Sequence, residues 1–113
     1  MKTAILSLVG AALMFAQSSA IRMHSLADIA GTSATVAIST FSTGAHWIQL
    51  VAPTGNASVV RWGGPETSAT TGSIIVPGGG QFTPPCPPGS YYLLNTVYVY
   101  VATGDKISIT YGQ

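Results

Sequence analysis

Short runs of β-branched and aromatic residues, each closed by Gly, Pro, Asn or Asp, follow one another along most of the chain. Such runs are typical of short strands, and the residues that close them are typical of turns. Six runs occur, over residues 35–41, 46–52, 57–62, 73–76, 97–102 and 106–111. The pattern predicts an all-β fold, either a small antiparallel β-sandwich or a barrel.

The last two runs are joined by Thr103-Gly104-Asp105. A three-residue loop that contains Gly is a common connection between paired antiparallel strands. We therefore expect residues 97–102 and 106–111 to form a hairpin.

Alternation within these two runs assigns their side chains to two faces. We expect the valines and isoleucines to face the core, and Tyr98 and Tyr100 to lie on the outer face as contact residues. The alternative is that both faces are buried between two sheets. The residues that share the expected core face are Val97, Val99, Val101, Ile107, Ile109 and Tyr111.

Charged residues are scarce, at 6% of the chain, whereas an ordinary soluble domain has about 25%. From residue 21 onward the net charge is zero, because three cations balance three anions: Arg22, Arg61, Lys106, Asp28, Glu66 and Asp105. A near-neutral surface promotes association, since little repulsion opposes it. We expect a subunit that neighbours cover; the alternative is a Ser/Thr-rich β-domain that stays free.

The same scarcity excludes two classes of partner. Without a basic patch, nucleic acid has no electrostatic footprint on the protein. No polybasic stretch indicates an anionic membrane surface, so membrane contact is expected only through residues 1–20.

Residues 1–20 form a hydrophobic segment of the secretory type, with one lysine, an apolar stretch over 4–16 and small residues before a possible cleavage after Ala20. The stretch is shorter than the roughly 20 residues that a membrane span needs. Three interpretations stay open. The segment is a cleaved signal peptide, it is a hydrophobic helix retained before the β-domain, or the chain starts at Met23.

Residues 21–34 are expected to form an N-terminal arm, and residues 35–113 the β-domain. Ile21, Leu26 and Ile29 are compatible with a short helical turn that ends at Gly31, although the periodicity is weak.

Two segments read as loops. Residues 63–72 are polar, and residues 77–90 are rich in Pro and Gly. Long irregular segments in compact domains are usually functional or flexible. We expect residues 77–90 to lie extended on a neighbouring subunit, because proline reduces the entropy lost on ordering.

The sequence predicts no enzyme, no cofactor and no metal site. His24 and Asp28 are four residues apart, but a solvated pair is the simpler interpretation. Cys86 has no partner for an intrachain disulfide and no neighbouring histidine to activate it. No motif for hydrolysis, phosphate binding or metal binding occurs. The sequon that starts at Asn56 is discounted, because such triplets arise often by chance.

The candidate residues for an assembly interface are aromatic, arginine and proline side chains, the first two being the commonest interface anchors. Because Arg61 and Trp62 are adjacent in a strand, they point to opposite faces, and one of them is expected to face outward. The alternative is that at least one tryptophan belongs to the core. The full set is Trp47, Arg61, Trp62, Phe82, Pro84, Pro85, Tyr98 and Tyr100.

Three strings carry a family resemblance: HWIQLVAPTGNASVVRWGGPETSATTG, then VPGGGQFTPP, and finally VYVYVATGDKISITYG. Together they resemble small β-structured virion proteins of tailed bacteriophages, of the decoration, cement or minor structural kind. The resemblance covers about Arg22 to Gln113, and its most distinctive part is GDKISITY at residues 104–111.

The resemblance implies a β-sandwich or barrel that binds major capsid or tail proteins, forms dimers or trimers, and stabilises the virion without catalysis. Two features depart from the pattern. One is the secretory-type N-terminus, which if retained implies an internal, tail or membrane-contacting component. The other is Gly63-Gly64-Pro65, where such proteins often carry Gly-Asp.

A second hypothesis places the protein outside the virion. An exported module, periplasmic or extracellular, would use the same aromatic residues to bind a sugar or a peptide, because ring faces stack on apolar ligand faces.

Overall fold

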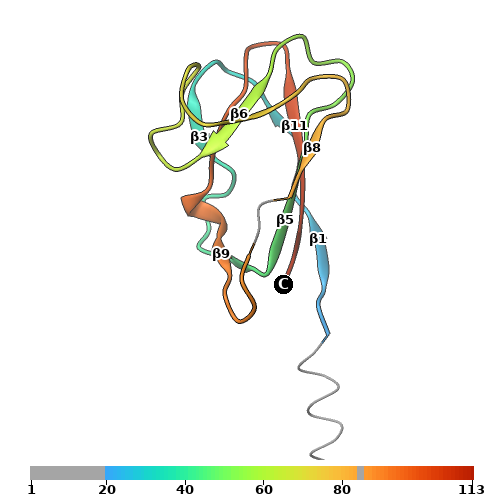
Figure 1. Cartoon of the computed structure of the whole chain (residues 1–113), viewed down its shortest axis with the longest axis vertical. Coiled ribbons are helices and arrows are strands. Elements are labelled where there is room, and N and C mark those ends of the chain that lie inside the picture. Colours follow the sequence, from blue (N-terminus) through green and yellow to red (C-terminus); the bar gives the residue numbers. More distant parts are fainter. Residues whose placement is uncertain (1–19, 84–85) are drawn as a thin grey trace, which may run out of the picture.

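The computed structural model describes residues 20–83 and 86–113 (Figure 1). The expected hydrophobic helix of residues 1–20 therefore lies, except for Ala20, outside the described residues, as do Pro84 and Pro85. Within the described part of the chain, no helix is long and apolar enough to cross a membrane.

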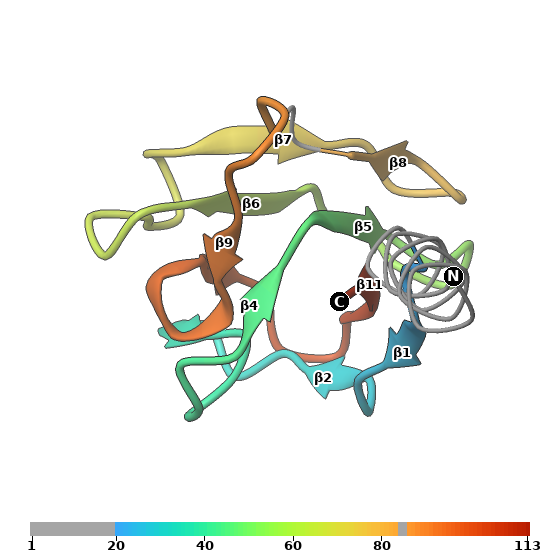
Figure 2. The ribbon, with the colours of Figure 1, turned by 90° about the horizontal axis from the view of Figure 1, so that it is seen from below.

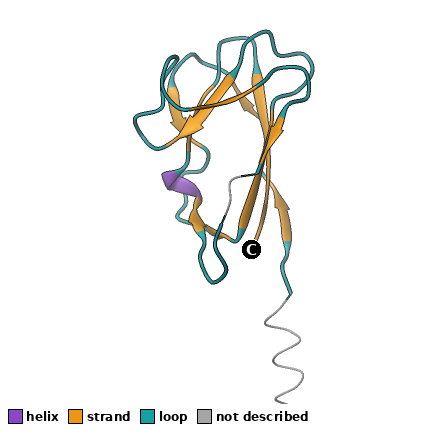
Figure 3. Ribbon diagram, in the orientation of Figure 1, coloured by secondary structure: helices purple, strands orange, loops and turns teal. Residues whose placement is uncertain are grey.

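The described residues are all-β, as expected, with one turn of 3-10 helix, η1 (Leu94–Thr96) (Figure 3). Every strand pair is antiparallel. The sheet that we call the β11 sheet has the order β1-β11-β5-β8, with β2 also paired to β11. Its strands are β1 (Met23–Ser25), β2 (Ile29–Ala30), β5 (Trp47–Val51), β8 (Gln81–Phe82) and β11 (Lys106–Gly112).

A second sheet, which we call the β10 sheet, has the order β3-β10-β6-β7. Its strands are β3 (Thr35–Ala37), β6 (Val60–Gly63), β7 (Ser73–Ile75) and β10 (Tyr98–Tyr100). A small third sheet pairs β4 (Gly44–Ala45) with β9 (Tyr92–Leu93). Figure 2 shows β6 and β7 of the β10 sheet on one side of the interior and β1 and β2 of the β11 sheet on the other.

Both sheets contribute apolar side chains to one core. One buried cluster contains Ile48, Leu50, Ile107 and Ile109 from the β11 sheet together with Val60, Ile75 and Val99 from the β10 sheet. Val97, Val101 and Tyr111 join it, which confirms the core face expected from alternation. Burying each such side chain stabilises the fold by about 1.5–3 kcal/mol.

The expected hairpin is wrong, because β10 and β11 follow each other in sequence but lie in different sheets. The N–H of Asp105 donates to the carbonyl of Ala102 at 3.0 Å, which closes a turn. Ser33 donates to the carbonyl of Val101, and Gly31 donates to that of Asp105. The backbone between β10 and β11 is thus hydrogen-bonded to residues 31 and 33 of the N-terminal segment, where the chain crosses from one sheet to the other.

The N-terminal arm forms short strands rather than the helical turn with which its apolar residues were compatible. The segment forms β1 and β2, which pair with β11 on the side opposite β5. Arg22 and Gln113 exchange backbone hydrogen bonds of 2.9 and 2.8 Å. The segment is extended because it pairs with β11, whose long edge would otherwise leave a row of backbone N–H and C=O groups without partners. Just after β2, the backbone of Gly31 lies close to that of Ala102, since a Cβ at Gly31 would lie 1.9 Å from the carbonyl oxygen of Ala102.

Part of the Pro- and Gly-rich segment lies on its own sheet. Ala52 exchanges backbone hydrogen bonds with Gly79 and Gly80 at 2.9 and 2.8 Å, and β8 then pairs with β5. The expectation that residues 77–90 lie on a neighbouring subunit is therefore wrong for residues 79–82.

A buried polar cluster fixes the start of β11. The side chain of Asn56 donates to the carbonyl of Lys106 at 2.7 Å and accepts from its N–H at 2.9 Å. The carboxylate of Asp105 accepts from the N–H groups of Ala57 and Ser58 at 2.9 and 3.0 Å. We call this cluster the polar clasp. Asn56 is only 8% exposed, so the folded protein does not present this amide for glycosylation.

We predict that Asp105→Asn lowers the free energy of unfolding by about 1.5–3 kcal/mol, the range for hydrogen bonds to a charged group. The amide has one oxygen, so its NH₂ group would face one of two backbone donors. Urea unfolding followed by circular dichroism measures the change. The control, Asp28→Asn on an exposed side chain, should change stability by less than about 0.5 kcal/mol. Equal effects of the two substitutions would contradict the role of the clasp.

Candidate assembly surface

The outer face of the β10 sheet carries three of the candidate residues. Strand register aligns one residue from each strand in a row across this face: Thr35, Tyr100, Arg61 and Ile74. A second row holds Tyr98 between Ala37 and Gly63. Because buried Val99 lies between the two tyrosines in β10, both rows point away from the core.

Trp62 lies on the inner face of the same sheet. It is in register with Val99 and packs against the core. Arg61 and Trp62 therefore point to opposite faces, and the arginine is the one that faces outward.

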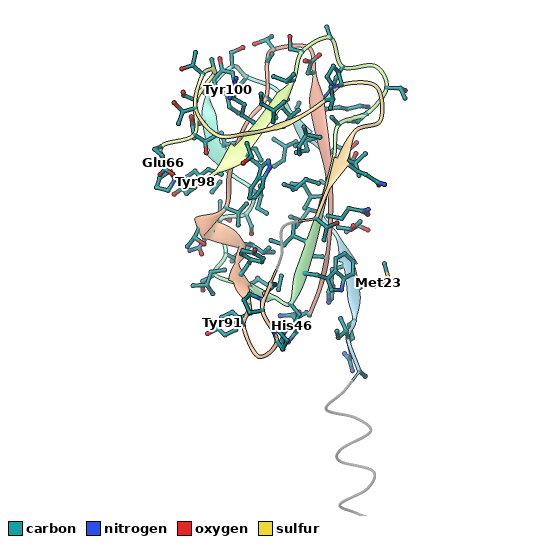
Figure 4. All side chains as sticks on the ribbon, viewed as in Figure 1. Met23, His46, Glu66, Tyr91, Tyr98 and Tyr100 are labelled. Atoms are coloured by element: carbon teal, nitrogen blue, oxygen red, sulfur yellow. The ribbon has the colours of Figure 1, made fainter. Side chains whose placement is uncertain are left out.

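The loop over residues 64–72 crosses the outer face of β10. The hydroxyl of Thr35 donates to the carbonyl of Thr67, and Arg61 Nη1 donates to the carbonyl of Gly72 at 3.0 Å. Since β10 lies between β3 and β6, the loop must pass over it to make both bonds. It leaves Tyr98 and Tyr100 half-buried. Figure 4 shows both tyrosines on the same side of the molecule as Glu66, which belongs to this loop.

Beyond β6 the outer face ends at β7, a strand paired on one side only within the described part of the chain. Ile74 is 52% exposed, and Val76, just after the strand, is 63% exposed. An edge of this kind presents backbone N–H and C=O groups to another strand. Here no charged residue of β7 opposes such pairing.

Trp47 lies elsewhere, on the outer face of the β11 sheet, in register with Gly112. A Cβ built on Gly112 would lie 2.1 Å from Nε1 of the indole, 2.6 Å from Cε2 and 2.7 Å from Cδ1. The two atoms bonded to Nε1 are thus almost as close as Nε1 itself. The Cβ position therefore faces the plane of the ring rather than its edge, and the indole lies flat over Gly112.

The structure thus separates the candidate residues. Arg61, Tyr98 and Tyr100 share one outer face, Trp47 lies on the other, and Trp62 faces inward. The backbone of Phe82 belongs to β8, at one edge of the β11 sheet. No sequence signal indicated that a loop would cover β10, because the Thr35–Thr67 bond joins residues 32 apart.

One pocket, of about 250 Å³, brings together His46 and Cys86, which the sequence left unrelated. Ala20, Ile21 and residues 87–90 complete the lining, so the described lining contains no acidic side chain. The described residues also contain no group of three or more His, Cys, Asp or Glu that could hold a metal ion.

Burial raises the pKa of the nearby Tyr92 hydroxyl above its ordinary value of 10.0, and Cys86 raises it further. The fold favours the protonated phenol. This contribution to stability is fully present below pH 10.0 and is lost as the pH rises through the higher folded pKa.

Comparison of the chain with protein-family models, with curated proteins and with solved structures finds no match. Function is therefore inferred from the geometry of these surfaces.

We predict that Gly112→Ala lowers the free energy of unfolding by about 1–3 kcal/mol, as overpacking does, because the new methyl group must displace the indole of Trp47. Urea unfolding measures the loss of stability, and the tryptophan emission spectrum measures the displacement of the indole. Gly55→Ala is the matched control, since nothing lies within 4 Å of its Cβ position. Identical behaviour of the two variants would mean that the indole does not cover Gly112.

We predict that part of the phenolate absorbance of the folded protein develops late in an alkaline titration, above pH 10.0, and that Tyr92→Phe removes this part. Concentrated denaturant should remove it too, because unfolding ends the burial. Cys86→Ser should lower the pKa of Tyr92 by less than unfolding does, since burial is the larger cause. A late component that persists in Tyr92→Phe would refute the assignment.

Proposed function

We propose that the chain is a structural subunit of a virion that binds and stabilises neighbouring capsid or tail subunits, with no catalytic role. One observation supports this most strongly. The outer face of the β10 sheet, crossed by the 64–72 loop, carries half-buried Tyr98 and Tyr100 and exposed Ile74, and it ends at the open edge of β7. Such a face offers both side-chain and backbone contacts to a protein partner.

We also propose that the two larger sheets form a small antiparallel β-sandwich or barrel, the architecture of the virion proteins that the sequence resembles. The single core cluster to which both sheets contribute supports this arrangement. In it the outer faces of the two sheets point away from each other, which leaves one free while the other binds a partner.

Association through β7 suits a homo-oligomer and favours a dimer over a trimer. An antiparallel strand can pair with its own copy about a two-fold axis, which brings the Ile74 side chains of the two copies close together. Charge does not oppose the contact, because the chain carries a formal net charge of only +1. Val76 adds exposed apolar surface beside the strand.

We predict that the purified full-length chain self-associates and that Ile74→Lys weakens the association at least tenfold, or about 1.4 kcal/mol, because lysine on an edge strand opposes pairing. Sedimentation velocity over a concentration series measures the effect. Phe41→Lys is the matched control, since Phe41 is 73% exposed and lies outside the strands.

Association with a virion needs its own test. Mass spectrometry of purified virions that encode this chain should detect it in amounts comparable with those of their other structural subunits. Monomeric sedimentation at every concentration, together with absence of the chain from such particles, would overturn the proposed function.

A further inference from the structure

We propose that the outer face of the β11 sheet around Trp47 binds a neutral polysaccharide chain. This site is separate from the assembly surface on the β10 sheet. It goes beyond the structural role, because it gives the protein a ligand that is not a subunit.

The indole of Trp47 turns one face of its ring toward solvent. One face of the Trp47 ring packs on Gly112, which has no side chain to lift the ring from the sheet. Trp47 is half-exposed, so the opposite face of the ring is the one that reaches solvent. Met23 lies in the same row beyond Gly112 and is 73% exposed. A flat aromatic ring of this kind packs against the apolar C–H face of a sugar ring.

Most of the side chains beside the ring carry hydroxyl or amide groups. The next row along the sheet consists of Ser25, Thr110 and Gln49, and the row after it of Ser108, Val51 and Gln81. Hydroxyl and amide groups both donate and accept hydrogen bonds, as sugar hydroxyls do. Gln49 Nε2 donates to Gln81 Oε1 at 3.1 Å, which holds two of these amides in a defined orientation across adjacent strands.

The rows around Trp47 carry no charge. Neither of these polar rows, nor the row of Trp47, contains an acidic or basic residue. Lys106, at the opposite end of β11, pairs with Ala30. The rows run along a strand at roughly 7 Å intervals, so the uncharged surface extends over several of them. This complements a ligand without phosphate or carboxylate groups.

A protein partner fits this face less well. The buried centre of a protein interface is apolar and is depleted in serine, whereas the rows beside Trp47 are mostly polar. The outer face of the β10 sheet has the contrasting character, with two tyrosines and Ile74. A subunit attached through that face would present Trp47 on its free side.

Tryptophan fluorescence tests the proposal. In full-length Trp62→Phe, Trp47 is the remaining tryptophan, since the chain has two. We expect at least one of three neutral probes, cellohexaose, chitohexaose or maltohexaose, to change its emission saturably. Calorimetric titration of the protein that retains both tryptophans should then show that Trp47→Ala weakens binding at least tenfold. Tyr98→Ala, on the other outer face, should leave affinity unchanged, and added salt should have little effect.

Two further variants keep the test decisive if Trp47→Ala does not fold. Gly112→Ala keeps the ring but displaces it, and should weaken binding; Trp47→Phe keeps a smaller ring and should bind at intermediate affinity. Absence of saturable binding to all three probes, equal affinity in the displaced-ring variant, or tighter binding of heparin than of any neutral probe would overturn the proposal. Ile74→Lys should still bind the sugar, so failure of the assembly role and failure of this site are distinguishable.

Discussion

The fold depends on the pairing of β11 along both of its edges. This strand is bonded to β5 on one side and to β1 and β2 on the other, so it joins the N-terminal segment to the middle of the chain. The polar clasp fixes where β11 begins, because Asn56 and Asp105 hold the loop before β6 against the start of β11. Buried groups of this kind specify one register strongly, since any shift would leave them without partners.

Scarcity of charge has different consequences on the two outer faces. On the β10 sheet it combines with tyrosines and Ile74, which gives a face suited to protein contact. On the β11 sheet it combines with amides and hydroxyls around a flat indole, which gives a face suited to a neutral polar ligand. Net charge alone indicated association but did not distinguish these two chemistries, because the difference lies in which uncharged residues strand register brings together.

Sequence patterns predicted the all-β fold and the core face of β10 and β11, because alternation depends only on neighbouring residues. They did not predict that these strands lie in different sheets, since a hairpin and a crossing show the same alternation around Thr103-Gly104-Asp105. β1 and β2 were missed because two- and three-residue strands carry almost no periodic signal. Of the candidate residues, the sequence indicated that Arg61 and Trp62 face opposite ways. It gave no sign that Trp47 lies on a different sheet from Tyr98 and Tyr100, because that separation depends on sheet topology.

The bonds between Arg22 and Gln113 bring the start of the described β-structure beside the C-terminal residue. Adjacent ends of this kind permit circular permutation, in which a short linker joins them and new termini open in a surface loop. For the same reason the domain suits insertion into a loop of another protein, since entry and exit points coincide. An attachment at either end therefore starts at the same pole of the molecule, beside the row of Met23, Gly112 and Trp47.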